Sequence, residues 1–139
     1  MVGETDLRAL ISQMRPMLDP EPYVFCTFAQ KQISELALLS PIGLFQETEG
    51  VTAILPAEQA RALGLVEAEW FRRITLTVHS SLEAVGLTAA IANALADAGI
   101  SANVVAAYFH DHVFVPAERA DESLAILLSL ARSSLQEPG

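Results

Sequence analysis

The sequence predicts an α+β protein built from two similar halves, in which helices cover one face of antiparallel sheets. Stretches that alternate apolar and polar residues are interspersed with stretches of helical periodicity. The pentapeptide PAEQA at 56–60 recurs as PAERA at 116–120, and each copy follows an expected β-hairpin and opens a helix. The composition, 52% hydrophobic and 18% charged, is typical of a globular chain. We therefore expect an internal duplication, with halves at 1–69 and 70–139.

The first half begins with an amphipathic helix. Its apolar face consists of Leu7, Leu10, Ile11 and Met14, and Pro16 ends the pattern. The expected elements after it are a strand over 23–29, two short elements over 34–39 and 43–47, a strand over 49–56 entered through a turn at Glu49-Gly50, and a short helix from Pro56 that stops before Gly64.

The second half has the clearer pattern. The expected elements are a strand over 69–79, a helix over 82–98, a hairpin of strands 101–109 and 112–116 turning at His110-Asp111, and a helix over 116–134. Gly99 is a normal left-handed position for a helix end. The last helix buries a stripe of Ala120, Leu124, Leu127 and Ala131. This β-α-β-β-α order is a split βαβ unit that lacks its last strand, which the first half could supply.

Charge and composition exclude several classes of partner. The formal net charge is −9, from 17 acidic and 8 basic residues, so the chain repels nucleic acid. No apolar run is long enough for a transmembrane helix, and the first ten residues lack the basic start of a signal peptide. We expect a cytoplasmic protein. Cys26 is the sole cysteine, and its apolar surroundings favour a buried thiol over a nucleophile.

The segment VHSSLEAVGL at 78–87 holds the candidate binding site. A glycine inside a helix costs roughly 1 kcal/mol relative to alanine, so Gly86 needs a reason. A helix N-terminus offers free N–H groups and partial positive charge to a carboxylate, and a glycine lets a ligand approach the backbone. Topology also places His79, Ser80 and Ser81 at the same sheet edge as the hairpin residues His110, Asp111 and His112.

Each of these features has a simpler interpretation. Gly86 could serve tight packing, the two serines could be helix caps, and Glu83 could complement the helix dipole. The His110–His112 turn could be a solvated turn, and H-x-H across a turn is a weak metal signal. A stripe of small residues, Ala89, Ala92 and Ala96, would admit another helix, from this chain or from a second subunit.

The segment EAVGLTAAIANALADAGISANVVAAYFHDHVFVP at 83–116 resembles the ACT domain family, whose members are small regulatory modules with a ferredoxin-like βαββαβ fold that bind amino acids. In the family pattern D-x-P-G-L-L-A, Gly86 and Leu87 match, whereas Glu83 takes the place of the aspartate and Val85 that of the proline. Gly99-Ile100 follows in step. The resemblance extends over 70–132. It implies an ACT-like architecture of two interlocked halves and, because the first half lacks the glycine motif, at most one full site. Ala106-Ala107 replace the Ser-Thr that related sensors often carry.

We therefore predict a non-catalytic sensor that binds an amino acid or similar small carboxylate around residues 79–88, with no cofactor and no metal. The candidate ligand-binding residues are His79, Ser80, Ser81, Glu83, Val85, Gly86, Leu87, Asn103, Tyr108 and His110. We expect a homodimer, with room for a further protein partner. The alternative is a module that dimerises or docks on a partner without any ligand, which the alanine stripe and the missing hydroxyls favour. No catalytic triad, phosphate loop or metal set supports an enzyme.

Overall fold

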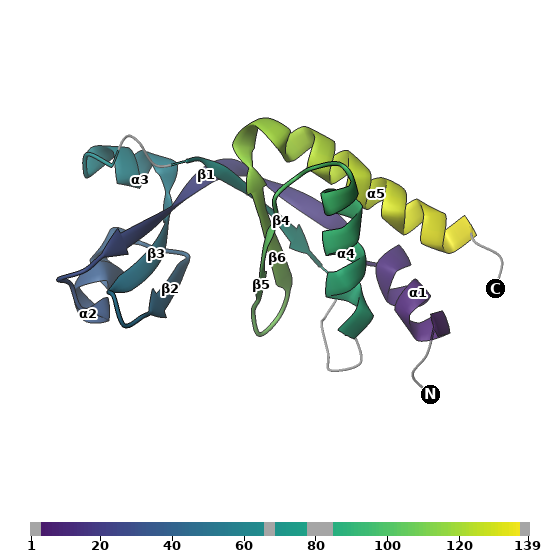
Figure 1. Ribbon diagram of the computed structural model, residues 1–139, viewed down its shortest axis with the longest axis horizontal. Helices are drawn as coiled ribbons and strands as arrows, with labels where there is room; N and C mark the ends of the chain where they lie inside the picture. Colours follow the sequence, from purple (N-terminus) through teal and green to yellow (C-terminus); the bar gives the residue numbers. More distant parts are fainter. Residues whose placement is uncertain (1–3, 66–68, 78–84, 137–139) are drawn as a thin grey trace. The chain divides into compact units, whose positions relative to one another are not determined.

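The computed structural model describes residues 4–65, 69–77 and 85–136 (Figure 1). In chain order the elements are α1 (Glu4–Ser12), β1 (Pro16–Phe28), α2 (Ile33–Leu36), the 3₁₀ turn η1 (Ala37–Leu39), β2 (Gly43–Gln46), β3 (Val51–Pro56), α3 (Ala57–Ala62), β4 (Phe71–Leu76), α4 (Val85–Asp97), β5 (Asn103–Ala106), β6 (Asp111–Pro116), the 3₁₀ turn η3 (Ala117–Arg119) and α5 (Ala120–Gln136). After α1, the order β-α-β-β-α occurs twice. The predicted α+β fold is confirmed.

The strands follow the order β2-β3-β1-β4-β6-β5. The segment β1-β4-β6-β5 is the ferredoxin-like arrangement, with β1 as the fourth strand that the second half lacks. Two hydrogen bonds join this part of the chain to the β4 region. Thr77 N, just after β4, donates to Met14 O, just before β1, at 2.9 Å, and the side-chain Nε of Arg72 donates to Asp19 O at 2.8 Å. The first half therefore supplies the missing strand, as predicted.

The repeat extends to the hydrogen-bond register. Gly43 pairs with Ile54 in the first hairpin, and Asn103 pairs with Phe114 in the second, each 60 positions later. The turns also correspond, because Glu47 N donates to Gly50 O and Ala107 N donates to His110 O. β3 and β6 even share one alternation of buried and half-buried residues. Two copies of one unit would produce such agreement.

The chain divides into two compact units. Unit 1 combines the residues up to Asp19 with those from Arg72 onward, and unit 2 is Pro20–Phe71. The core of unit 1 lies between β4 and β6 and the helices α1, α4 and α5, and its central residues are Met14, Ile74, Leu76, Leu87, Ile91, Leu95, Val113, Val115 and Leu127. The core of unit 2 consists of Val24, Cys26, Ala53, Leu55, Ala57 and Ala60. Helix α1 thus belongs to the core of unit 1, although it opens the first half of the sequence.

Three local predictions need correction or refinement. β1 begins at Pro16 rather than at residue 23. Its prolines all lie before Tyr23, the residue at which pairing with β3 starts, so they lie outside the ladder in which their missing N–H groups would be needed. The second hairpin turns at Tyr108-Phe109, not at His110-Asp111, and Asp111 is the first residue of β6. Residues 34–39 are helical and 43–46 form a strand. Gly99, with φ +73°, has the left-handed conformation expected after α4.

Candidate functional site

Helix α4 provides the framework of the predicted site. His79, Ser80, Ser81 and Glu83 lie outside the described residues, and Val85 is the first residue of α4. Among the described residues of α4, the first turn contains no acidic side chain, whereas α5 begins with Asp121 and Glu122. The described first turn of α4 therefore adds no negative charge to the partial positive charge of its backbone N–H groups.

Gly86 has a close neighbour, and that neighbour is helix α1. A Cβ atom at Gly86 would lie 2.6 Å from Cδ2 of Leu7 and 3.3 Å from its Cδ1. The missing side chain thus lets α1 pack against the start of α4. The next residue, Leu87, is fully buried in the core of unit 1. Under the packing interpretation of Gly86, the neighbour that requires a glycine is therefore Leu7 of α1.

The sequence analysis placed Asp111 at this edge but did not include it among the candidate ligand-binding residues. Its side chain is only 3% exposed, and among the described residues its Oδ1 atom has no hydrogen-bond partner. By strand alternation Asp111 shares the helix-covered face of the sheet with Val113 and Val115. The internal repeat could have revealed that Asp111 is buried. The residue 60 positions earlier, at the same place in the first hairpin, is the fully buried Val51.

Asp111 and the start of α4 lie at the same end of unit 1. β4 leads into α4, and in an antiparallel sheet the end of β4 and the start of β6 share one edge. Figure 1 shows the tip of the β5–β6 hairpin at the same end as the first turn of α4. The fold thus brings a carboxylate and a helix N-terminus to one edge of the sheet.

The other predicted hairpin residues are spread along the hairpin. Tyr108 is 84% exposed at the turn, where its ring meets Phe109 edge-on at 5.0 Å. His110 ends the turn, and its Nδ1 is buried and lacks a hydrogen-bond partner in the described part of the chain. Asn103 lies at the far end of β5, opposite Phe114. Tyr108 and His110 therefore lie near Asp111 at the tip, and Asn103 does not.

A polar row occupies the strands on the face of unit 1 away from the helices. Arg73 pairs with Asp19 at 2.9 Å, and Thr75 Oγ1 is 2.9 Å from Nδ1 of His112. Burial lowers the pKa of His112 below its usual range, and the positive charges of Arg73 and His110 lower it further, against a smaller opposite effect of the Asp111 carboxylate. His112 is thus held neutral near physiological pH. In the described ranges no group of three or more His, Cys, Asp or Glu side chains could hold a metal ion.

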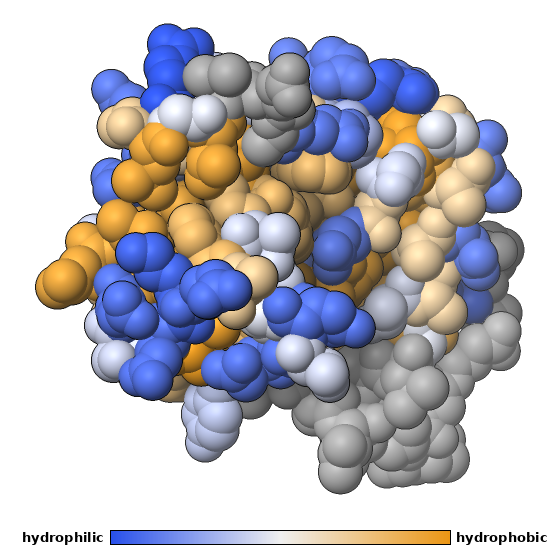
Figure 2. All heavy atoms as spheres, turned by 60° about the vertical axis from the view of Figure 1, so that its left-hand side comes forward, coloured by the Kyte–Doolittle hydropathy of each residue, from blue (hydrophilic) through white to orange (hydrophobic). Residues whose placement is uncertain are grey.

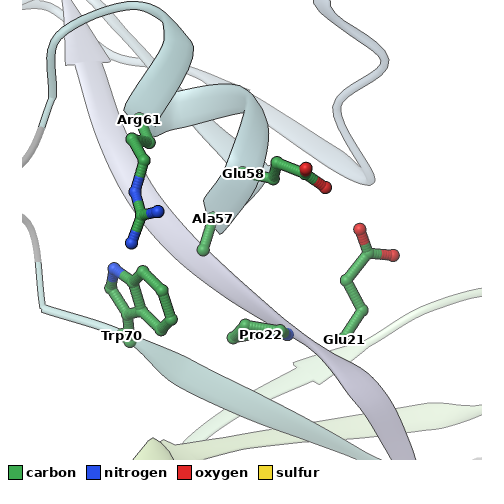
Figure 3. Close-up of a pocket in the computed structure, with 6 residues that line it drawn as sticks. All are labelled: Glu21, Pro22, Ala57, Glu58, Arg61 and Trp70. Atoms are coloured by element: carbon green, nitrogen blue, oxygen red, sulfur yellow. The ribbon is translucent and has the colours of Figure 1, made fainter.

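Unit 2 has a separate shallow pocket of about 250 Å³ (Figure 3). Its floor is Ala57 and Pro22, and Arg61 from α3 lies over the ring of Trp70 at 5.7 Å from the ring centre. The carboxylates of Glu21 and Glu58 line the opposite side. The charged groups at this pocket are all exposed, unlike Asp111.

Two ACT domain models match the sequence, one over residues 2–72 and the other over residues 72–129. The chain belongs to the ACT domain family. The models meet in β4, where the second β-α-β-β-α unit begins. None of the described helices has the length and hydropathy needed to cross a bilayer.

Solved structures extend the comparison. A protein of unknown function from Vibrio cholerae, described as a possible transport protein, is 51% identical with a TM-score of 0.78, over 88% of this chain and 93% of that one. The ligand-free regulatory subunit of aspartate kinase from Thermus thermophilus has a TM-score of 0.59 at 16% identity, over 83% of this chain and 95% of that one. E. coli aspartokinase III in complex with aspartate and ADP has a TM-score of 0.58 at 13% identity, over 83% of this chain but 32% of that one. No curated protein matches the chain.

Proposed function

We propose that this chain is a non-catalytic, cytoplasmic regulatory module that binds an amino acid or similar small carboxylate at the start of α4, around residues 79–88. The observation that carries the proposal is the match of both halves to ACT domains, a family of regulatory ligand-binding modules. The start of α4 supports it, because the described residues of its first turn include no acid that would compete with a ligand carboxylate. The arrangement shared with an aspartate kinase regulatory subunit agrees with such a role.

Thermal denaturation with each of the twenty amino acids tests this function. A ligand at 100 times its Kd should stabilise the native protein by about 2.7 kcal/mol, which raises the melting temperature measurably. No shift with any of them at millimolar concentration would contradict the proposal.

A matched pair of variants tests the location. Thr88 is exposed in the first turn of α4, and Ala96 is exposed near its last turn. Thr88→Asp should stabilise the free helix by about 0.3–1 kcal/mol but weaken carboxylate binding, because the new charge occupies the positive end of the dipole. Ala96→Asp adds the same charge at the other end and should leave the Kd unchanged. Equal Kd values for both variants would place the ligand elsewhere.

The second candidate is a protein-interaction module, and the apolar surface of unit 2 favours it. Leu38 in η1 is 87% exposed and Phe45 in β2 is 70% exposed. Ile33 in α2 and Ile42, just before β2, are exposed as well. Figure 2, which turns α2, β2 and α3 toward the viewer, shows apolar surface open between hydrophilic groups. Light scattering decides: this candidate predicts a dimer that Phe45→Asp dissociates, and a monomeric wild-type chain contradicts the dimer.

A further inference from the structure

The turn between β5 and β6 carries two exposed aromatic side chains. Tyr108 is 84% exposed and Phe109 is 65% exposed, and their rings meet edge-on with centres 5.0 Å apart. We call these two residues the aromatic tip. Aromatic side chains remove a large apolar area from water when a partner covers them, and protein interfaces are rich in them for that reason.

The internal repeat shows that the fold does not need aromatic residues in this turn. The residues 60 positions earlier, in the turn of the first hairpin, are Thr48 and Glu49, and both are exposed. The two turns close with the same backbone hydrogen bond. Because the turn forms equally well with polar side chains, the aromatic tip indicates a contact outside the hairpin that carries it.

Unit 2 has an apolar pocket of about 210 Å³ beside α2 and the end of α3. Helices α2 and α3 have four and six residues, whereas α4 and α5 of unit 1 have 13 and 17. The short helices leave apolar side chains uncovered, and Leu63 is 43% exposed. The apolar lining of the pocket consists of Phe28, Leu36, Leu39, Leu63 and Leu65.

The size and the chemistry of this pocket fit the aromatic tip. A cavity of about 150 Å³ is large enough for a benzene ring, so the pocket has room for one aromatic ring and the other stays at the rim. The polar lining residues Lys31 and Glu35 are exposed and mark the rim, where Gln32 N donates to Oε1 of Glu35 at 2.9 Å. A carboxylate accepts a hydrogen bond from a tyrosine hydroxyl, and a lysine ammonium is attracted to the face of an aromatic ring. Phe109 therefore suits the interior, and Tyr108 suits the rim.

We propose that the aromatic tip of one chain binds in this pocket of a second copy, with Phe109 inside and the hydroxyl of Tyr108 donating to Glu35. Two chains with a net charge of −9 repel each other over most of their surface. The tip residues carry no charge, and the charges of Lys31 and Glu35 at the rim cancel. This contact therefore places no like charges opposite each other, which favours a second copy as the partner. It does not depend on ligand binding at α4 and goes beyond the proposed function.

The area of the contact predicts the strength of the association. Burial of two rings with these exposures removes roughly 300 Å² from one chain, and the pocket loses about as much. A single contact of about 600 Å² is too small for a stable complex, whereas two reciprocal contacts reach about 1,200 Å², the lower end of the range for specific interfaces. We therefore expect a weak dimer that forms through two identical contacts and dissociates on dilution.

Sedimentation velocity over a range of protein concentrations tests the contact. The tip variant, Tyr108→Thr together with Phe109→Glu, copies the first hairpin, and the pocket variant Leu63→Glu places a charge on an exposed lining residue. Each should raise the dimer Kd at least tenfold. Melting temperatures equal to that of the wild type, measured where the wild type is monomeric, show that the variants are folded.

Phe45→Asp is the matched control. Phe45 is an aromatic residue that is 70% exposed, and the substitution adds the same charge as Phe109→Glu. Leu44 packs against the core of unit 2, so by strand alternation Phe45 lies on the opposite face of β2. This variant should leave the dimer Kd unchanged.

Photo-crosslinking locates the contact. Benzoylphenylalanine in place of Phe109 should crosslink to a peptide that contains residues 28–39 or 63–65. A mixture of ¹⁴N-labelled and ¹⁵N-labelled chains distinguishes a crosslink between two copies from one within a chain, and we expect the crosslink between copies.

Three results would overturn the proposal. A chain that stays monomeric up to about 1 mM has no such contact. A dimer that persists in the tip variant but is dissociated by Phe45→Asp uses the surface of the second candidate function instead. Crosslinks confined to other segments, or to the same copy, place the aromatic tip elsewhere.

Discussion

The contact between Gly86 and Leu7 allows a quantitative test. Replacing Gly86 with alanine favours the helical state by about 0.5–1 kcal/mol, because alanine loses less backbone entropy. The new Cβ would, however, lie 2.6 Å from Cδ2 of Leu7, well inside contact distance. Displacing a packed side chain costs roughly 1–3 kcal/mol. The clash outweighs the helix term, so Gly86→Ala should destabilise the protein by about 1 kcal/mol.

The sign should reverse when Leu7 is shortened. Leu7→Ala removes the clashing methyl groups, so Gly86→Ala in that background should stabilise the protein by about 0.5–1 kcal/mol. The coupling between the two sites is then on the order of 2 kcal/mol, within the range seen for residues in contact. Urea denaturation of the wild type, both single variants and the double variant measures it. A coupling near zero, or one sign in both backgrounds, would refute the close approach of α1 to α4.

Two further predictions concern titratable groups. The folded pKa of His112 lies below its ordinary value of 6.5, so the unfolded state takes up the proton first. This contribution to stability is complete above pH 6.5 and is lost as the pH falls through the folded pKa. Melting temperatures between about pH 7.5 and 5 should therefore fall more steeply for the wild type than for His112→Gln, and equal slopes would contradict the assignment. Burial raises the pKa of the Cys26 thiol, so the native protein should react with a thiol reagent far more slowly than the urea-unfolded protein; equal rates would show an accessible thiol.

Periodicity and the short repeat were enough to predict the α+β fold and the repeated order of its strands and helices. The alternation around Ile74 and Leu76 and the cap at Gly99 both hold in the structure. Strand alternation and helix spacing are local properties, so a single sequence displays them.

Features that depend on tertiary contacts could not be predicted in the same way. The start of β1 at Pro16 depends on hydrogen bonds to β4, distant in sequence. Gly86 signalled a close approach, but only the fold identifies Leu7 as the neighbour. Asp111 looked like a turn residue because His-Asp-His is polar, whereas the register places the turn earlier and the carboxylate inside. An alignment of the two halves at Pro56 and Pro116 would have revealed the buried position of Asp111, because it places Asp111 opposite the apolar Val51.

The most direct test of the binding role is a titration followed by amide NMR. The amino acids that raise the melting temperature would be added to ¹⁵N-labelled protein, and the backbone signals of Gly86, Leu87, Thr88 and Asp111 followed. We predict saturable shifts that are largest at these amides, because the ligand carboxylate binds the first turn of α4. Unchanged signals at all four residues, or shifts confined to unit 2, would contradict the account.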